Sequence, residues 1–177
     1  PGYAFGGSCL PKDVRALDFR ANEVHAAHPL IASLMRSNEM HVKHAFDLVT
    51  SFGERRVGLL GLSFKAKTDD LRESPLVELA ELLIGKGYSV SIFDENVQYA
   101  RVHGANRDYI NRKIPHVADL LRSSIDEVIE SSDVLVIGQR DHQYERVLNG
   151  SRRGRKVVDL VGFMEHASNI EIQGICW

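Results

Sequence analysis

One cysteine lies in a glycine-rich loop, directly ahead of a predicted helix start, within the stretch GGSCLPKD at residues 6–13. The N-terminus of a helix favours the thiolate, which is the nucleophilic form of cysteine. Lys12 adds positive charge close to Cys9, and Asp13 follows where one helical turn can bring its carboxylate near the sulfur. A carboxylate there could orient a water molecule or act as a general base. These residue types predict covalent catalysis by Cys9, with a small cysteine buried in a turn as the alternative.

A second candidate site follows the apolar run at residues 56–64, which contains Gly58 and Gly61. Glycines at a strand end let a phosphate approach the backbone, but these two do not form the G-x-G-x-x-G fingerprint of dinucleotide-binding proteins. The next segment, residues 65–73, carries Lys and Arg side chains that could meet phosphates and carboxylates that balance them. It is therefore predicted to be either a phosphate-binding loop or a solvated, charge-balanced loop.

Asp94 and the histidines give weaker signals. Asp94 follows a predicted strand, where nucleotide-binding folds often hold a ribose, but without the glycine fingerprint a turn residue is the better interpretation. The pairs His25/His28 and His41/His44 have the i, i+3 spacing of metal ligands. No third ligand is evident in the sequence, so no metal site is predicted.

The elements that must position these residues alternate between strands and helices. Strand-length apolar runs occur at 56–64, 89–93, 134–137, 156–161 and 170–173, and helical patterns occur at 74–84, 125–130 and 142–148. This alternation predicts an α/β fold, a parallel sheet flanked by helices. Helices at about 11–24 and 29–52 precede the sheet, and the second could be a dimer spine or an amphipathic core helix. We divide the chain into a loop-and-helix segment, 1–53, and an α/β domain, 54–177.

The composition argues against several classes of function. The chain has 177 residues, with 22 basic and 24 acidic side chains and a net charge of −2. This balance argues against a general nucleic-acid surface and against an anionic-membrane binder. No apolar run approaches the ~18 residues of a membrane helix. Two distant cysteines do not make a disulfide framework, so a cytoplasmic location is expected. The opening Pro-Gly-Tyr reads as a loop, which predicts a part of a longer protein.

Two long motifs in order resemble those of the nucleotide-sugar 6-dehydrogenases, the family of UDP-glucose and GDP-mannose dehydrogenases. GYAFGGSCLPKDV (residues 2–14) is similar to the family's cysteine loop, and GLSFKAKTDDLRESP (residues 61–75) is similar to its second signature. The resemblance covers essentially this whole chain, but only the C-terminal part of the family's chain. It implies a Rossmann-like nucleotide-binding sheet that lacks the usual glycine fingerprint. The residues of both motifs are most similar to those of the GDP-mannose members, which favours GDP-mannose over UDP-glucose as the substrate.

The resemblance also implies a mechanism. Two NAD⁺ molecules take two hydrides from C6 of the sugar, and a cysteine carries first a thiohemiacetal and then a thioester, which water hydrolyses to the uronate. Cys9 matches the family nucleophile, and Asp13 matches its motif aspartate. Lys12 and Arg72 match positions near the NAD phosphates.

The substrate contacts and partners follow from the same resemblance. Tyr3 and Gly6 match the loop that lines the sugar nucleotide, and Lys65 matches a lysine that contacts the substrate. The family forms homodimers with a site shared across subunits, and its N-terminal NAD-binding domain has no counterpart here. One rival hypothesis is a non-catalytic nucleotide-sugar-binding and dimerisation module. Another is a cysteine hydrolase or thiol-redox protein, which depends on Cys9 alone.

Overall fold

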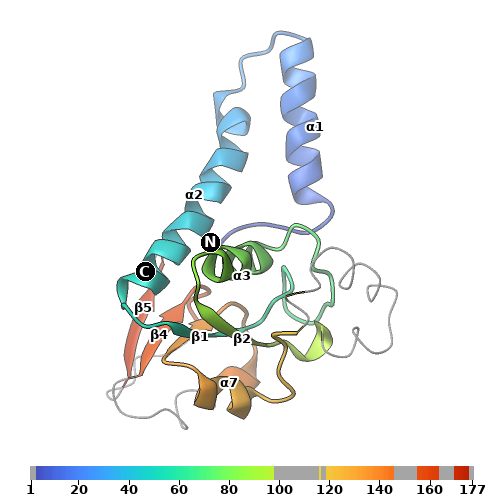
Figure 1. Ribbon diagram of the computed structural model, residues 1–177. Helices are drawn as coiled ribbons and strands as arrows, with labels where there is room; N and C mark the ends of the chain where they lie inside the picture. Colours follow the sequence, from blue (N-terminus) through green and yellow to red (C-terminus); the bar gives the residue numbers. More distant parts are fainter. Residues whose placement is uncertain (1–2, 98–115, 117–118, 146–154, 164–169, 176–177) are drawn as a thin grey trace.

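The computed structural model describes residues 3–97, 116, 119–145, 155–163 and 170–175, and shows a helical hairpin that projects from an α/β body (Figure 1). The hairpin consists of α1 (Leu10–Glu23) and α2 (Pro29–Ser51). The strands of the body are β1 (Arg56–Leu60), β2 (Ser89–Phe93), β3 (Val134–Ile137), β4 (Lys156–Asp159) and β5 (Glu171–Gly174). Its helices are α3 (Pro75–Gly85), α7 (Ile125–Ser131) and the 3-10 helix η1 (His142–Glu145). The strands pair in parallel in the order β2-β1-β3-β4-β5, so the predicted fold is confirmed.

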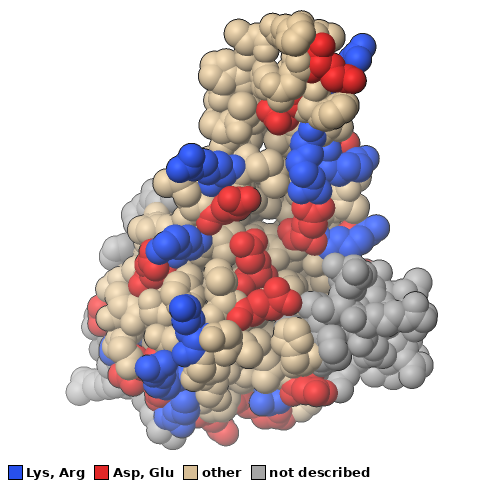
Figure 2. Space-filling view, turned by 45° about the horizontal axis from the view of Figure 1, so that its top comes forward, with Lys and Arg blue, Asp and Glu red and all other residues tan. Residues whose placement is uncertain are grey.

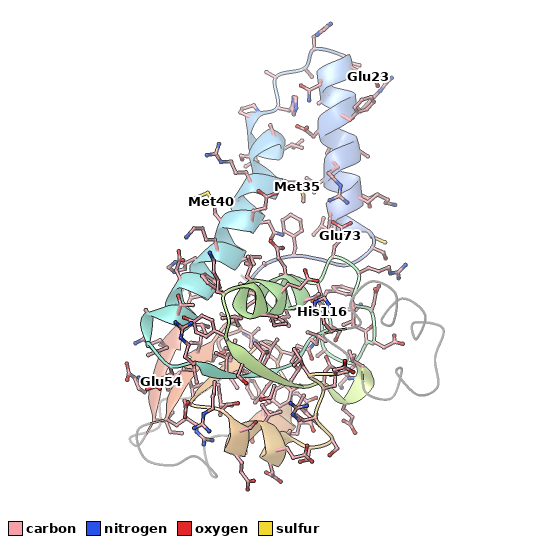
Figure 3. All side chains as sticks on the ribbon, in the orientation of Figure 1. Glu23, Met35, Met40, Glu54, Glu73 and His116 are labelled. Carbon is pink, nitrogen blue, oxygen red and sulfur yellow. The ribbon has the colours of Figure 1, made fainter. Side chains whose placement is uncertain are left out.

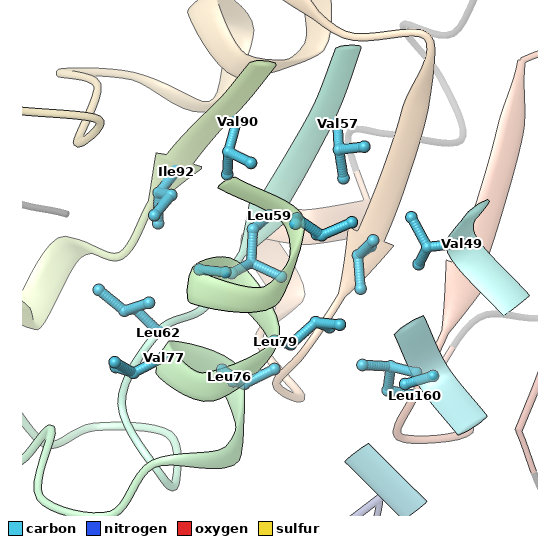
Figure 4. Packing of buried hydrophobic residues seen from close by; sticks show 14 of the residues in the cluster. Val49, Val57, Leu59, Leu62, Leu76, Val77, Leu79, Val90, Ile92 and Leu160 are labelled. Carbon is cyan, nitrogen blue, oxygen red and sulfur yellow. The ribbon is translucent and has the colours of Figure 1, made fainter. Parts of the chain in front are cut away.

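Strands β1 to β4 are buried on both faces of the sheet, whereas the edge strand β5 is partly exposed. Consecutive side chains of a strand point to opposite faces, so the strand residues divide between two apolar clusters. One cluster packs Leu59 and Val136 against α2 and α3 (Figure 4). The other packs Leu60 and Ile137 against Val128 of α7. The near-continuous apolar strands of the sequence are the signature of this two-sided burial.

Ser74 begins α3 and attaches it to the end of the sheet. Its Oγ accepts a hydrogen bond from the Leu76 N–H at 3.3 Å and donates one to the Leu62 carbonyl oxygen at 2.6 Å. Pro75 follows at the first helical position, where a missing N–H breaks no helical hydrogen bond. The helix start predicted from Ser-Pro is confirmed. It places residues 61–74, the β1–α3 loop, at the carboxyl end of β1.

The two halves of α2 differ in their surroundings. In the C-terminal half, Val42, Ala45 and Val49 are buried in the core, as an amphipathic core helix requires. The N-terminal half projects with α1 away from the body (Figure 1), and Leu30 is 74% exposed there. No helix within the described ranges combines the length and the apolar character required to cross a bilayer.

The first strand is shorter than predicted. It was expected to continue to residue 64 but ends at Leu60, because Gly61 takes a left-handed φ of 96°. The backbone N–H groups of Leu62 and Ser63 then donate to the Asp94 carboxylate, at 2.8 and 3.0 Å, instead of to a neighbouring strand. A side chain far along the sequence therefore ends the strand.

Other boundaries differ for local reasons. The strand predicted at 156–161 ends at Asp159, whose carboxylate accepts hydrogen bonds from the N–H groups of Val161 and Phe163. The predicted helix at 142–148 is a single 3-10 turn as far as Glu145, and the remainder of that prediction lies outside the described residues.

Candidate functional site

The strand order reverses direction at β1. From β1 the chain moves outward to β2 and then returns to form β3 on the other side of β1. In open parallel sheets, ligands bind in the crevice at the carboxyl ends of the strands at such a switch point. A cavity of about 430 Å³ lies there. It is lined by Phe64, Lys65 and Ala66 after β1, by Gly138, Gln139 and Arg140 after β3, by Val161 after β4, by Pro75 and Leu76 of α3, and by Tyr3 and Ala4.

The cavity combines cations with an unpaired hydroxyl group. The Tyr3 ring is only 4% exposed, and its hydroxyl has no hydrogen-bond partner among the described residues. Burial, and secondarily the charge of Glu78, raises the pKa of Tyr3, so the hydroxyl remains a donor. Arg140 is exposed, and its guanidinium donates to the Val161 carbonyl oxygen at 3.0 and 2.7 Å. Lys65 is also exposed, with its Nζ 5.4 Å from the centre of the Phe64 ring. Two cations and a hydroxyl beside apolar surface fit an anionic ligand.

Asp94 joins the loops that follow β1 and β3 at the carboxyl end of the sheet. Its Oδ2 accepts hydrogen bonds from the Leu62 N–H, from the Ser63 N–H and hydroxyl, and from Gln139 Nε2 at 3.3 Å. Its Oδ1 accepts from the N–H groups of residues 96 and 97 at 3.1 Å. Both oxygens are occupied and the residue is 1% exposed. The interpretation of Asp94 as a turn residue is therefore confirmed, and it does not face the cavity as a ribose ligand would.

The glycines after and within β1 serve packing. A Cβ atom at Gly58 would lie 2.6 Å from Ser132 Oγ and 2.7 Å from a Val128 methyl group. A Cβ atom at Gly61 would lie 2.6 Å from the Gln139 side chain. The suggestion that Gly58 and Gly61 admit a phosphate is wrong, because protein side chains already fill both spaces.

Cys9 occupies the N-cap position of α1, and its side chain is exposed. The Cys9 carbonyl oxygen accepts from the Asp13 N–H at 2.9 Å, while the Asp13 carboxylate lies 3.1 Å from Lys12 Nζ. The hydrogen bond and charge of Asp13 raise the pKa of Lys12, and the charge of Cys9 contributes in the same direction. A thiol, a cation and a carboxylate thus lie together at the start of α1.

The cysteine loop, residues 3–9, is held from both sides. Asn38 of α2 accepts a hydrogen bond from the Phe5 N–H through its Oδ1 and donates one to the Phe5 carbonyl oxygen through its Nδ2, both at 2.8 Å. On the other side, the Gly7 N–H donates to the Arg72 carbonyl oxygen at 3.0 Å. A Cβ atom at Gly6 would lie 2.1 Å from the Glu73 carbonyl oxygen, so only glycine permits this approach. The loop that carries Cys9 is therefore packed directly against the β1–α3 loop.

The structure groups the predicted site residues in three places. Tyr3 and Lys65 line one cavity, while Gly6 lies against the β1–α3 loop and does not line that cavity. Cys9, Lys12 and Asp13 lie at the start of α1. The guanidinium of Arg72 forms a bidentate pair with Asp70, at 2.8 and 2.7 Å, and chiefly through these hydrogen bonds lowers the pKa of that carboxyl.

Sequence reasoning missed Gln139 and Arg140, which line the cavity, and Asn38, which holds the cysteine loop. The position of the first two, directly after a buried strand, was the available signal, but only the strand order shows that this strand adjoins the switch point. Within the described residues, no three His, Cys, Asp or Glu side chains come together in a way that could hold a metal ion.

Two models of one protein family match the sequence. The UDP binding domain of the UDP-glucose/GDP-mannose dehydrogenase family matches residues 58–166, and its central domain matches residues 1–40. GDP-mannose 6-dehydrogenase of Pseudomonas aeruginosa is 64% identical over 177 residues, which cover 100% of this chain and 41% of that protein.

Two solved structures are similar over nearly the whole chain. A ternary complex of GDP-mannose dehydrogenase from Pseudomonas aeruginosa, with 64% identity, has a TM-score of 0.94 over 100% of this chain and 41% of that one. A UDP-glucose dehydrogenase from Pyrobaculum islandicum, with 29% identity, has a TM-score of 0.79 over 99% of this chain and 39% of that one. The chain thus spans about two fifths of the length of these relatives.

Proposed function

The chain belongs to the UDP-glucose/GDP-mannose dehydrogenase family, and on that premise we propose that it provides the nucleophile and the sugar-nucleotide pocket of a GDP-mannose 6-dehydrogenase. The preference for GDP-mannose is supported by the 64% identity to a GDP-mannose 6-dehydrogenase, against 29% to a UDP-glucose dehydrogenase. UDP-glucose is the alternative substrate.

The observation that carries the proposal is the cavity at the switch point. Lys65 and Arg140 contribute positive charge there, and the Tyr3 hydroxyl has no protein partner among the described residues. Charge-assisted hydrogen bonds from such cations suit the diphosphate of a sugar nucleotide. Because the cysteine loop begins in this cavity with Tyr3, a sugar extending from the diphosphate has a route toward Cys9.

Cys9 is proposed as the covalent catalyst. Its thiolate adds to the carbonyl carbon at C6 of the sugar aldehyde, and the carbonyl oxygen takes up a proton to give a thiohemiacetal. Oxidation of that adduct leaves a thioester on Cys9. Water then attacks the thioester carbon, which releases the uronate and regenerates the thiolate. We assign Asp13, one helical turn after Cys9, to orienting this water or accepting its proton.

Lys12 and Arg72 are proposed to contact NAD. When bound, NAD⁺ supplies the hydride acceptor for both oxidations. Lys12 is 65% exposed at the start of α1, and Arg72 is 53% exposed beside the cysteine loop. Two exposed cations, one in the first turn of α1 and one whose carbonyl oxygen accepts from the Gly7 N–H of the cysteine loop, fit contacts to the phosphates of this cofactor. The remainder of the NAD site is assigned to an N-terminal domain, in the same chain or a separate one.

We further propose a homodimer built on the helical hairpin, in a cytoplasmic setting. The hairpin leaves large apolar side chains uncovered, including Phe19 at 66% and Met40 at 63% exposure. A second copy of the chain would remove this surface from water. The free, exposed thiol of Cys9 is suited to a reducing compartment.

Calorimetric titration with GDP-mannose, and with UDP-glucose in parallel, tests the pocket. Replacing Lys65 with alanine is expected to weaken GDP-mannose binding about tenfold or more, because it removes a charge-assisted contact. Lys67→Ala is the matched control, since Lys67 lies in the same loop but does not line the cavity. Equal affinities of the wild type and Lys65→Ala would contradict the assignment of this pocket.

NADH formation tests the reaction. With NAD⁺ and the N-terminal domain present, about two NADH per GDP-mannose are expected from the four-electron stoichiometry. Cys9→Ser is expected to stop oxidation to the acid while GDP-mannose binding survives. Full activity of that variant would exclude the covalent mechanism. GDP-mannose binding without any NADH would favour the non-catalytic binding module.

A further inference from the structure

An ion pair joins α1 to the β1–α3 loop. Arg15 Nη1 donates to Glu73 Oε2 at 2.8 Å, and Arg15 Nη2 donates to Glu73 Oε1 at 2.7 Å. A bidentate pair of this kind fixes orientation as well as distance. Figure 3 shows Glu73 at the base of α1. Since Arg15 lies in α1 and Glu73 lies in the β1–α3 loop, the pair is a tertiary contact and not a local one within a helix.

At its far end α1 is held by the contact of Asp18 with His28 at 2.9 Å, but few of its side chains are buried. Its buried side chains are Pro11 and Val14, whereas Leu17 and Phe19 are more than half exposed. A helix that buries little apolar surface depends more on directional contacts for its position. The Arg15 pair is therefore well placed to determine where the first turn of α1 lies.

The electrostatic surroundings favour this pairing. Arg15 and Glu73 line a groove of about 570 Å³ together with Glu39, Glu78 and Glu81. Figure 2 shows acidic side chains, in red, near the middle of this face below the projecting end of the hairpin. Burial, and then the charges of Glu39 and Glu81, raises the pKa of Glu78. In contrast, the hydrogen bonds from Arg15 lower the pKa of Glu73. The surroundings thus favour the ionised form of Glu73 and disfavour that of Glu78.

The backbone of Glu73 is also unusual. Its φ of 47° lies in the left-handed region, which residues other than glycine rarely adopt. Strained conformations persist where the surrounding structure holds them, and they concentrate at functional sites. The Gly7 N–H bonds to the preceding carbonyl at Arg72, and Arg15 holds the Glu73 side chain. Both restraints come from the segment that carries Cys9.

We propose that Arg15 and Glu73 are positioning residues, whose ion pair places Cys9 relative to the pocket that contains Lys65. Arg15 follows Cys9 by about 1.7 turns of helix, or ~9 Å along the axis, so a shift at Arg15 is transmitted to the N-cap. At the other end, Glu73 belongs to the same β1–α3 loop as Lys65. This inference rests on the proposed function, because it assigns the pocket and Cys9 to one substrate.

Amide hydrogen exchange tests the restraint without any ligand. In the 177-residue protein, Arg15→Gln and Glu73→Gln are expected to speed exchange at the Gly7 and Asp13 amides roughly 1.5- to 5-fold, the range of exposed ion pairs. The double charge reversal Arg15→Glu/Glu73→Arg should restore the slower exchange. Arg20→Gln is the matched control, because Arg20 pairs with Glu23 inside α1. Unchanged exchange in both single variants would overturn the proposal.

Protection of Cys9 from iodoacetamide by GDP-mannose tests positioning, in a Cys176→Ser background that leaves Cys9 as the single thiol of the chain. In the single variants, GDP-mannose should protect Cys9 roughly 1.5- to 5-fold less than in the wild type. The GDP-mannose dissociation constant should stay within twofold of the wild-type value. The double charge reversal should restore the protection. Faster amide exchange with undiminished protection would reduce the pair to a structural role and overturn the proposal. If GDP-mannose does not bind the wild type at all, the proposed function fails, and the positioning role fails with it even if the amides respond.

Discussion

Replacing Asp94 with asparagine should destabilise the α/β body strongly. Each carboxylate oxygen acts only as an acceptor, Oδ2 for groups of Leu62, Ser63 and Gln139 and Oδ1 for two N–H groups of the following turn. Asparagine has one carbonyl oxygen and one NH₂ group, so one set of donors must face another donor. Because the residue at position 94 is only 1% exposed, water has no room to substitute for the lost acceptor.

The size of the effect follows from the less damaging orientation of the amide. With the NH₂ group toward residues 96 and 97, the four contacts at Oδ2 keep an oxygen and two hydrogen bonds are lost. A hydrogen bond to a charged group contributes ~1.5–3 kcal/mol, so the free energy of unfolding should fall by about 3–6 kcal/mol. At ~2–4 °C per kcal/mol for a chain of this size, Tm should fall by about 6–24 °C.

Thermal and urea unfolding of the variant provide the measurement. Asp47→Asn is the control, because Asp47 is an exposed carboxylate on α2 that pairs with nearby Lys43, one turn before it on the same helix. Its unfolding free energy should change by less than about 0.5 kcal/mol. If Asp94→Asn is also within that range, the carboxylate does not hold the end of β1 to β2 in the way described above.

Two further predictions concern the cysteine loop and the hairpin tip. Gly6→Ala should lower Tm and speed amide exchange in the cysteine loop, because its Cβ would meet the Glu73 carbonyl, whereas Gly85→Ala, with open space around it, should be neutral or stabilising in the same melt. The two ring nitrogens of His28 contact the Ala26 carbonyl oxygen and the Asp18 carboxylate. Both contacts raise the pKa of His28 above 6.5, and the contact with Ala26 has the larger effect. The hairpin tip should therefore be most stable below pH 6.5 and should loosen as pH rises through the folded-state pKa. An NMR titration giving a His28 pKa at or below 6.5 would contradict this.

Element type and most boundaries could be predicted where the determining signal is local. Ser74 and Pro75 specify the start of α3 through a hydroxyl cap and a fixed φ, and the helix begins there. The strand at 134–137 is apolar on both sides, and it is a central strand buried on both faces. In these segments, local preference and tertiary packing agree.

The end of β1 and the lining of the pocket were missed because distant residues decide the local structure there. The end of β1 depends on a carboxylate that follows β2, so the local apolar pattern at residues 61–64 could not reveal it. Arg140 becomes a pocket residue only because β3 lies beside β1, and strand order is not encoded in periodicity. Cys9 and Lys65 could be selected because their motifs resemble those of a known family, and their catalytic and binding roles remain predictions.

The absence of a glycine fingerprint changes how this sheet can bind an anion. In dinucleotide-binding folds, the first strand turns directly into a helix whose free N–H groups hold the phosphate. Here the hydroxyl of Ser74 caps α3, and Pro75 brings no N–H to its first position. The N–H groups of Leu62 and Ser63 are engaged by Asp94. The positive charge at the switch point must therefore come from the side chains of Lys65 and Arg140. Since exposed side-chain charges are screened by salt, binding of a sugar nucleotide here should weaken as ionic strength rises.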